Sequence, residues 1–238
     1  MSSVDIVPYI FEGCNTYVEP FAGSFGAGFN VMEQKYIPRV VLNDKDYFVY
    51  NFWYCIKENS DFVIENIRKI HKDIYQLDYV SAMKKLEECK NSTDKYIQAA
   101  YEYLYMENRY SFNSHNRYIK ELNIHEDDFI DASIRLMEVD ILNIDCLDIL
   151  DRYDSDSTLF MMDPPYNVSK IDKYYRGKCS EFNHAGLREK LDGLKGKWIV
   201  RYNEEPLTAD LYRDTKILFK TSRNLMGTEY IEVYYTNM

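Results

Sequence analysis

The sequence predicts an α/β protein whose doubly wound sheet is split by a helical insertion. Three features lead to this prediction. A glycine-rich turn follows the first predicted strand, an acidic residue follows the second, and a later apolar strand stops at the segment Asp163-Pro164-Pro165-Tyr166. We assign residues 1–50 and 138–238 to the sheet domain and residues 51–137 to the insertion.

Length, composition and charge narrow the class of protein. The 238 residues suffice for one large domain that carries a sizeable insertion, and 46% hydrophobic residues suit a globular core. The net charge of −10 argues against a protein that coats DNA unspecifically, although a local basic groove is compatible with it. Tyrosine is in excess, with 23 residues, and a tyrosine-rich surface can stack nucleic-acid bases.

The cysteines and the hydropathy pattern exclude further classes. The five cysteines are scattered and form no metal-binding pattern, so we expect reduced thiols, no metal site and a cytoplasmic protein. No apolar run approaches the roughly 18 residues that a membrane span needs, and no signal-peptide pattern opens the chain. We therefore expect no membrane association.

The first two predicted strands point to a ligand site. A strand at residues 16–18 leads into a glycine-rich turn and the start of a helix, where backbone amides favour polar or anionic groups. A second strand at residues 39–42 ends at Asn43-Asp44. An acid in this place accepts hydrogen bonds from ribose hydroxyls in dinucleotide-binding folds. The alternative is a helix N-cap, since aspartate is common there as well.

The insertion is predicted to be helical. Apolar residues recur at three-to-four spacing from residue 47 to about residue 108, and a further helix is expected at residues 126–137. Between them we predict a polar loop, residues 107–118, that carries Arg109, Asn113 and Arg117. These side chains either contact phosphates or base edges, or belong to a solvated loop.

The sheet resumes with predicted strands at residues 138–143 and 159–162. The second of them ends at Asp163, because neither of the two following prolines can donate a hydrogen bond to a sheet ladder. The carboxylate is thereby exposed at the edge where open α/β sheets bind ligands. A strand stop with a simple turn is the alternative. A helix at residues 184–194, a strand at 197–203 and two terminal antiparallel strands, 217–220 and 229–235, complete the prediction.

The order of these motifs resembles that of the Dam-like DNA adenine methyltransferases of the α group. The segment Tyr17-Val18-Glu19-Pro20-Phe21-Ala22-Gly23 is similar to the cofactor motif of that family, and Asp163-Pro164-Pro165-Tyr166 to its catalytic motif. Further similarities are Leu42-Asn43-Asp44 with the ribose-binding acid, residues 99–117 with the recognition segment, Asp145-Cys146 with the Gly-Asp-Phe segment, Lys197–Asn203 with the Lys-Phe-x-x-Ser-Tyr-Asn strand, and residues 234–237 with the closing strand. The resemblance covers nearly the whole chain in family order.

The resemblance implies a Rossmann-like methyltransferase sheet with a target-recognition insertion, and S-adenosylmethionine as the cofactor. It assigns catalysis to Asp163, the carbonyl of Pro164 and Tyr166, with the target adenine flipped out of duplex DNA. Cofactor contacts fall to Phe21, Ala22, Gly23, Asp44, Asp145, Cys146 and Asp163. Asp145 is equally well explained as a helix cap, and Cys146 as a small packing residue. Lys170 and Lys173, in a basic run after the motif, are candidates for phosphate contacts, with an ordinary surface as the alternative.

Three departures from the family pattern stand out. The Gly-Gly-Lys segment that opens the family pattern is missing or replaced by Ser2-Ser3-Val4. Phe25 stands where the last glycine of the family's Phe-x-Gly-x-Gly motif is usual, with Gly26 one place later. The Gly-x-Phe-Asn-x-Pro hairpin, which helps to read target bases, has no counterpart between Arg117 and Glu138.

Three functional hypotheses follow. The first is N6-methylation of adenine in double-stranded DNA by an enzyme of a bacterial or phage-infected cell. The second is a methyltransferase-like binding protein with weak or no catalysis, which depends on a partner or mimics DNA. A protein partner, or assembly with a second copy of the chain, is also expected as a possibility of the sequence. The third is methylation of RNA or of cytosine, although aspartate at the start of the motif favours adenine.

Overall fold

The computed structural model describes residues 6–112, 118–165, 182–225 and 228–238, apart from the side chains of 109–112, 223–225 and 228–230. The chain divides into two compact units. The first unit contains Met1–Asp44 and Ile144–Met238, and the second contains Lys45–Asn143. The second unit is thus an insertion into the sequence of the first.

The first unit is built on a sheet whose strands are parallel in one part and antiparallel in the other. Within this unit the order of the strands in the sheet is β2, β1, β4, β5, β7 and β6. The first four run parallel, whereas β7 is antiparallel to both β5 and β6. The strands are β1 (Thr16–Glu19), β2 (Arg39–Asn43), β4 (Thr158–Met162), β5 (Lys197–Asn203), β6 (Lys216–Leu225) and β7 (Thr228–Thr236). This is the doubly wound, Rossmann-like α/β class that the sequence predicted.

The order of the strands creates a switch point between β1 and β4. On one side of it the chain proceeds from β1 outward to β2, and on the other side from β4 outward to β5. Both strands end at the same edge, and each is followed by a proline, Pro20 after Glu19 and Pro164 after Asp163. Ligands of open α/β sheets bind outside the carboxyl ends of strands at such a point.

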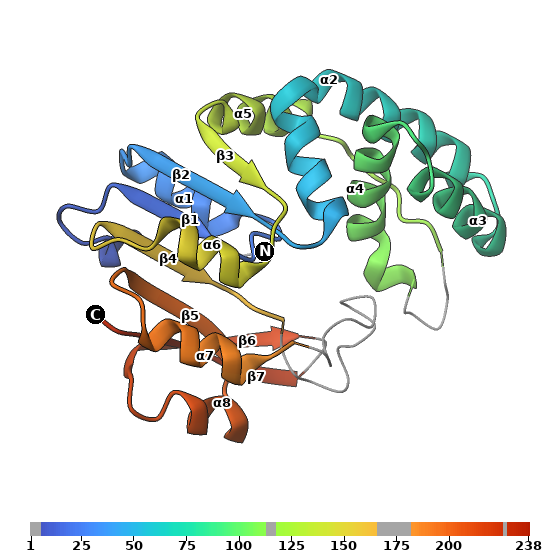
Figure 1. Cartoon of the computed structure of the whole chain (residues 1–238). Helices are drawn as coiled ribbons and strands as arrows, with labels where there is room; N and C mark the ends of the chain where they lie inside the picture. The colour runs from blue at the N-terminus through green and yellow to red at the C-terminus, as the bar shows by residue number, and fades with distance from the viewer. Residues whose placement is uncertain (1–5, 113–117, 166–181, 226–227) are drawn as a thin grey trace. The chain divides into compact units, whose positions relative to one another are not determined.

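The described part of this unit contains five short helical segments, of which α1, α6, α7 and α8 are labelled in Figure 1. The helix α1 directly follows the glycine-rich turn, as expected from the sequence. Two of the others, α6 and α8, were not predicted. The segments are η1 (Val7–Tyr9), α1 (Gly26–Gln34), α6 (Cys146–Tyr153), α7 (His184–Asp192) and α8 (Pro206–Leu211).

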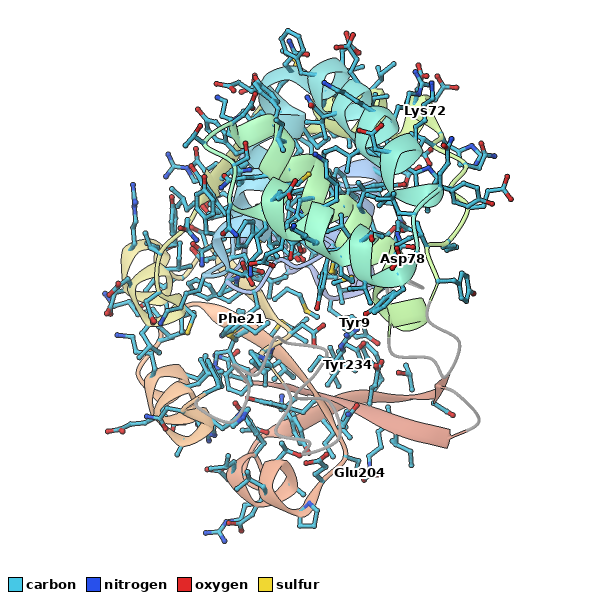
Figure 2. The ribbon with its side chains drawn as sticks, turned by 90° about the vertical axis from the view of Figure 1, so that its right-hand side faces the viewer. Tyr9, Phe21, Lys72, Asp78, Glu204 and Tyr234 are labelled. Atoms are coloured by element: carbon cyan, nitrogen blue, oxygen red, sulfur yellow. The ribbon has the colours of Figure 1, made fainter. Side chains whose placement is uncertain are left out.

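Aromatic side chains pack on both faces of the sheet. On one face, Tyr202 contacts Tyr212 at 5.6 Å between ring centroids. On the other face, the ring of Phe219 stacks on Tyr9 at 5.3 Å and on Tyr234 at 4.2 Å. Figure 2 shows Tyr9 and Tyr234 in the same part of the molecule. The three stacked rings tie η1 to the antiparallel end of the sheet.

As far as its residues are described, the second unit consists mainly of four helices (Figure 1). They are α2 (Tyr47–Tyr75), α3 (Tyr79–Lys90), α4 (Lys95–Phe112) and α5 (Glu126–Leu136), and the short strand β3 (Val139–Leu142) follows them. The backbone of α2 departs from helical geometry at Asn59. Beyond this point Val63, Ile67, Ile70 and Ile74 are buried at helical spacing, whereas Phe62 is 50% exposed. Helix α2 packs against α4 and α5.

The structure corrects the start of the predicted polar loop. Residues 107–112 are helical, because α4 continues to Phe112. The side chain of Asn108 is fully buried and donates to the carbonyl of Leu104 at 2.8 Å, while its oxygen accepts the amide of Lys120 at 2.6 Å. An asparagine whose amide group is satisfied in this way does not end a helix, and the segment has no proline or glycine that would.

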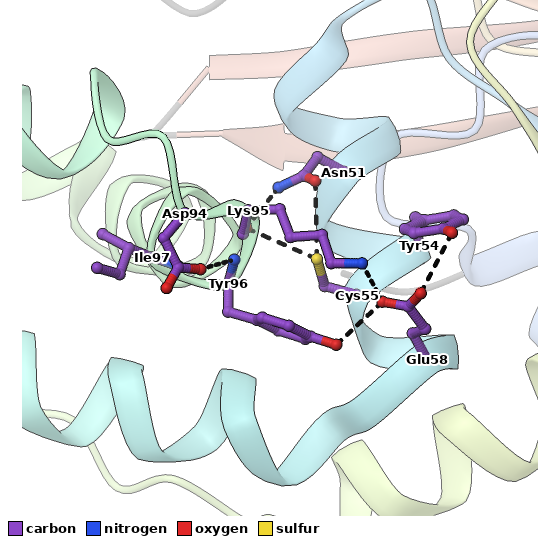
Figure 3. Close-up of polar contacts among 8 residues, drawn as sticks. All are labelled: Asn51, Tyr54, Cys55, Glu58, Asp94, Lys95, Tyr96 and Ile97. Atoms are coloured by element: carbon purple, nitrogen blue, oxygen red, sulfur yellow. Dashed lines mark hydrogen bonds and ion pairs between the residues drawn. The ribbon is translucent and has the colours of Figure 1, made fainter.

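A polar cluster joins α2 to the start of α4 (Figure 3). The buried amide of Asn51 donates to the backbone carbonyl of Lys95 at 2.8 Å. Nearer the surface, the carboxylate of Glu58 forms an ion pair with Lys95 and accepts a hydrogen bond from Tyr96 at 2.9 Å. The thiol of Cys55 is buried beside Asn51 and the carbonyl of Lys95, and this burial raises its pKa to about 12.

Candidate active site

The glycine-rich turn is held in place by the acid that follows β2. The amide of Gly23 donates to the carboxylate of Asp44 at 3.0 Å, across 21 residues of sequence. Gly23 has a φ of +49°, and a Cβ added to it would meet no atom within 4 Å. The turn therefore presents its backbone to open space, and Asp44 lies directly beside it.

The sequence left open whether Asp44 is a ligand-binding acid or a helix cap. In the structure the cap of α2 is Asp46, whose carboxylate accepts the amide of Phe48 at 3.0 Å. Asp44 is instead bonded to Gly23. The arrangement excludes the N-cap interpretation of Asp44 and leaves this carboxylate at the glycine-rich turn.

Phe25, at the position that departs from the family pattern, adopts the left-handed backbone conformation that glycine usually supplies. Its φ is +52° and its ψ is +27°, and its side chain is fully buried. Such a conformation costs a bulky residue of the order of 1–2 kcal/mol. The ring packs over Gly28, where a Cβ would come within 2.2 Å of the ring. The turn therefore keeps its shape with a phenylalanine because Gly28 provides the space.

Asn43 connects three segments at the edge of the sheet. Its fully buried side chain donates to the carbonyls of Pro20 at 3.0 Å and Ile144 at 3.1 Å, and accepts the amide of Ile144 at 3.0 Å. Its backbone carbonyl accepts the amide of Ala22 at 2.9 Å. One residue thus fixes the turn after β1, the end of β2 and the segment that precedes Asp145.

Asp145 and Cys146 stand at the start of α6. The carboxylate of Asp145 accepts the amide of Leu147 at 3.0 Å and so caps this helix. Cys146 is the first helical residue and is buried. The helix cap, one of the two interpretations from the sequence, is therefore present. A contact of either residue with a cofactor stays a proposal.

Asp163 follows the last residue of β4 and pairs with Arg201 on the neighbouring strand β5. The guanidinium is bidentate, with Nε 3.1 Å from Oδ1 and Nη2 2.5 Å from Oδ2 of Asp163. The register explains the contact, because Met162 is opposite Val200 and the next residues are therefore neighbours on the same face. The side chain of Asp163 keeps 37% of its surface exposed, and the following Pro164 is buried.

Glu19, the last residue of β1, lies on the same sheet face. It is 5% exposed and accepts a hydrogen bond from the Tyr17 hydroxyl at 2.7 Å. Burial raises the pKa of Glu19 to about 8, against the opposing effect of hydrogen bonds from Tyr17 and the Gly28 amide. The negative charge of Asp163 raises this pKa further, while Arg201 lowers it. Glu19 is therefore largely uncharged at neutral pH.

The remaining predicted residues divide as follows. Phe21 is half-buried and makes an edge contact with Phe182 at 5.5 Å, and Ala22 is buried. Arg109 lies in α4, but its side chain is outside the described part of the chain. The positions outside the described residues are Asn113, Arg117, Tyr166, Lys170 and Lys173.

Sequence reasoning missed the roles of Asn43, Glu19 and Arg201. A usable signal existed for two of them, since a charged residue inside an otherwise apolar strand must find a partner when it is buried. Glu19 ends a strand of three buried residues, and Arg201 stands between the buried Val200 and Tyr202. No comparable signal marks Asn43, because its partners lie far away in sequence.

The described residues contain neither a metal-binding cluster nor a membrane-spanning helix. In this part of the chain, His, Cys, Asp and Glu side chains nowhere gather in a group of three or more that suits a metal ion. Of its helices, none combines the length and hydropathy that crossing a membrane requires.

Together these observations define the class of protein. A doubly wound sheet carries a glycine-rich turn, an acid after the second strand and a carboxylate after β4, all at the carboxyl edge beside its switch point. The model of the D12 class N6 adenine-specific DNA methyltransferases matches residues 4–225. The chain belongs to this family of DNA methyltransferases.

Comparison with curated proteins gave no match. Among solved structures, the chain is similar to the proposed methyltransferase yhhF from Escherichia coli, with 10% identity, a TM-score of 0.40, and 98% of this chain and 82% of that chain covered. A methyltransferase from Geobacter sulfurreducens shows 14% identity, a TM-score of 0.36 and coverage of 93% and 70%. A proposed methylase from Haemophilus influenzae shows 13% identity, a TM-score of 0.36 and coverage of 98% and 91%.

Proposed function

We propose that this protein transfers a methyl group from S-adenosylmethionine to the N6 amine of adenine in DNA. The observation that carries the proposal is the position of Asp163: in a chain of the adenine-specific family, a partly exposed carboxylate follows β4 at the switch point of the sheet. We assign binding of the methyl donor to the glycine-rich turn after the neighbouring strand β1.

The turn and its acid fit the proposed donor. Open space above Gly23 admits a ligand against the backbone, and Asp44 next to it is suited to ribose hydroxyls. We assign Phe21, Ala22 and Asp145 to the same pocket, because Asn43 holds the turn after β1 and the segment that precedes Asp145 together. When bound, S-adenosylmethionine supplies an electrophilic methyl group on its sulfonium.

Asp163 and the carbonyl of Pro164 act on the acceptor. The lone pair of an exocyclic adenine amine is conjugated with the ring, so the amine is a poor nucleophile. A carboxylate and a carbonyl that accept its two hydrogens favour a tetrahedral nitrogen and stabilise the positive charge that develops there. The nitrogen gains the methyl group as the carbon–sulfur bond of the donor breaks, and one amine proton passes through the Asp163 carboxylate to solvent. The target base must leave the duplex to reach this edge, and Tyr166 is assigned to stack on it.

The proposal is tested in two steps with the full chain. Calorimetry with S-adenosylmethionine measures binding of the donor. Transfer of a tritiated methyl group to unmethylated duplex DNA then measures catalysis, and chromatography of the digested product distinguishes N6-methyladenine from N4-methylcytosine. We expect donor binding, N6-methyladenine as the product, and a rate at least about 100-fold lower for Asp163→Ala.

Asp156→Ala is the matched control, because this exposed aspartate precedes β4 at its opposite end. It should keep the wild-type rate. If the chain binds no donor at millimolar concentration, catalysis of methyl transfer by this chain alone is ruled out. Methylated cytosine as the product contradicts the proposed acceptor, and activity that survives Asp163→Ala contradicts the proposed mechanism.

A further inference from the structure

Arg201 occupies a place that the family pattern gives to a serine. The strand Lys197-Trp198-Ile199-Val200-Arg201-Tyr202-Asn203 has arginine where the similar family strand has serine. A cation inside a buried strand needs partners, because an unpaired buried charge is costly. The side chain of Arg201 is 16% exposed, so its partners determine what it contributes.

The guanidinium lies between two carboxylates. Its Nε and Nη2 engage both oxygens of Asp163, and its Nη1 is 4.0 Å from Oε2 of Glu232 on β7. Glu232 is buried, with 6% of its side chain exposed, and Thr221 donates to it at 3.4 Å. A bidentate arginine fixes both the plane and the rotation of a carboxylate, which a single hydrogen bond does not.

The charges of the group matter as much as its geometry. A cation paired only with Asp163 would neutralise the carboxylate. The carboxylate would then stabilise the positive charge that develops at the acceptor amine less strongly. Glu232 offsets this effect, because two formal negative charges and one positive charge leave the group with a net charge of −1. Glu19, on the same face, is largely uncharged at neutral pH because burial raises its pKa to about 8.

We propose that Arg201 is a positioning residue for Asp163: shared with Glu232, it holds the carboxylate in one orientation toward the acceptor amine while the group stays negative. This inference rests on the proposed methyl transfer. Each carboxylate oxygen has further lone pairs beyond the one that faces the guanidinium, and Asp163 is partly exposed. It can therefore accept an amine hydrogen without release of Arg201.

The test compares Arg201→Met, Arg201→Lys and Glu232→Gln in single-turnover methyl transfer to duplex DNA, with donor affinity measured by calorimetry. For Arg201→Met we expect a rate about 10- to 100-fold lower and donor affinity within about threefold of wild type, since misplacing a reacting group by about 1 Å can cost 100-fold. Arg201→Lys restores the charge without the bidentate fork and should lie between Met and wild type. Glu232→Gln should lower the rate about 3- to 10-fold.

The background variant Asp163→Asn separates positioning from a structural role. Arg201→Met should cause no further loss of rate in this background if it acts through Asp163, whereas a general structural defect lowers the rate in both backgrounds. Arg213→Met is the matched control, since the ion pair of Arg213 with Asp210 lies at the surface, with both side chains exposed. It should keep the wild-type rate.

Each other outcome counts against a defined claim. An Arg201→Met rate within twofold of wild type, or an equal further loss in the Asp163→Asn background, overturns the positioning role. If Arg201→Met does not fold, Arg201→Lys decides, and a wild-type rate for it also overturns the role. A wild-type chain without methyl transfer overturns the proposed function, and the positioning role falls with it. A Glu232→Gln rate equal to wild type removes Glu232 from the proposal.

Discussion

The ring of Phe25 fills the space that a side chain on Gly28 would need. A Cβ at Gly28 would lie 2.2 Å from Cε2 of this fully buried ring. The two residues are thus interdependent: the phenylalanine accepts a left-handed backbone at the turn, and the glycine one helical turn later makes room for its ring.

Gly28→Ala should therefore destabilise the protein by about 1–3 kcal/mol, the range seen when extra atoms are forced into a packed core. Urea unfolding followed by circular dichroism measures the change. Gly193→Ala is the control, because the closest atom to a Cβ there is at an ordinary 3.7 Å; it should change stability by less than about 0.5 kcal/mol. Equal effects of the two substitutions would contradict the packing argument.

Glu19 should make the stability of the protein fall as the pH rises. Its pKa in the folded chain, about 8, lies above the ordinary value of 4.5, so the folded state binds the proton more tightly than the unfolded state. The contribution is fully present below about pH 4.5 and is lost as the pH rises through 8, at roughly 1 kcal/mol per pH unit.

Urea unfolding at pH 5, 6, 7 and 8 measures this dependence, and Glu19→Gln should remove it. The quantity to compare is the change of the free energy of unfolding with pH and not its absolute value, because the amide also changes the hydrogen bonds with Tyr17 and Gly28. Glu189→Gln, at an exposed carboxyl on α7, should keep the wild-type slope. A wild-type slope in Glu19→Gln shows that Glu19 does not titrate as its burial implies.

In the second unit the buried amide of Asn51 should contribute more to stability than the ion pair beside it. Asn51 is 3% exposed, and its loss leaves the carbonyl of Lys95 without this donor. Glu58 and Lys95 keep 41% and 40% of their side chains exposed, and solvent screens such pairs. We expect about 2 kcal/mol for Asn51→Ala and less than about 1 kcal/mol for Glu58→Gln.

Hydrogen exchange of peptides from α2 and α4 localises the effect to this unit, and urea unfolding gives its size. The two substitutions serve as controls for each other, because they lie two turns apart on one helix. A larger loss for Glu58→Gln than for Asn51→Ala would reverse the ranking.

Asn43→Ala should destabilise the first unit by about 3 kcal/mol, because it removes three hydrogen bonds and leaves buried backbone groups unsatisfied. Urea unfolding measures the loss, and the amide of Ile144 should exchange hydrogen faster. Asn30→Ala on α1 is the control, since its hydrogen bond with Gln34 is exposed. An unchanged exchange rate at Ile144 would show that Asn43 does not hold this segment.

The strands and long helices could be predicted because their hydrophobic periods are clear, as in the buried residues of β4 and of α2. The helices α6 and α8 could not. They have 8 and 6 residues, and helices of this length depend on tertiary packing more than on local propensity. The extension of α4 to Phe112 escaped prediction for a related reason. The side chain of Asn108 is satisfied by the amide of Lys120, a tertiary contact that the local sequence does not indicate.

The candidate site shows the same limit. Asp163 and the glycine-rich turn were found because strand, turn and proline lie together in the sequence. The pairing of Asp163 with Arg201 depends on the register of β4 against β5, and Glu232 joins them from β7. The sequence contains each of these residues, but not the strand order that brings them together.

Asn43 also determines how the inserted unit is attached. Asn43 and Ile144 are 101 residues apart, and Lys45–Asn143 lies between them. The chain thus leaves the sheet domain and returns to it at two points that one side chain clamps together. In topological terms, the inserted unit is a closed excursion of the chain, and one amide side chain joins the two ends of that excursion.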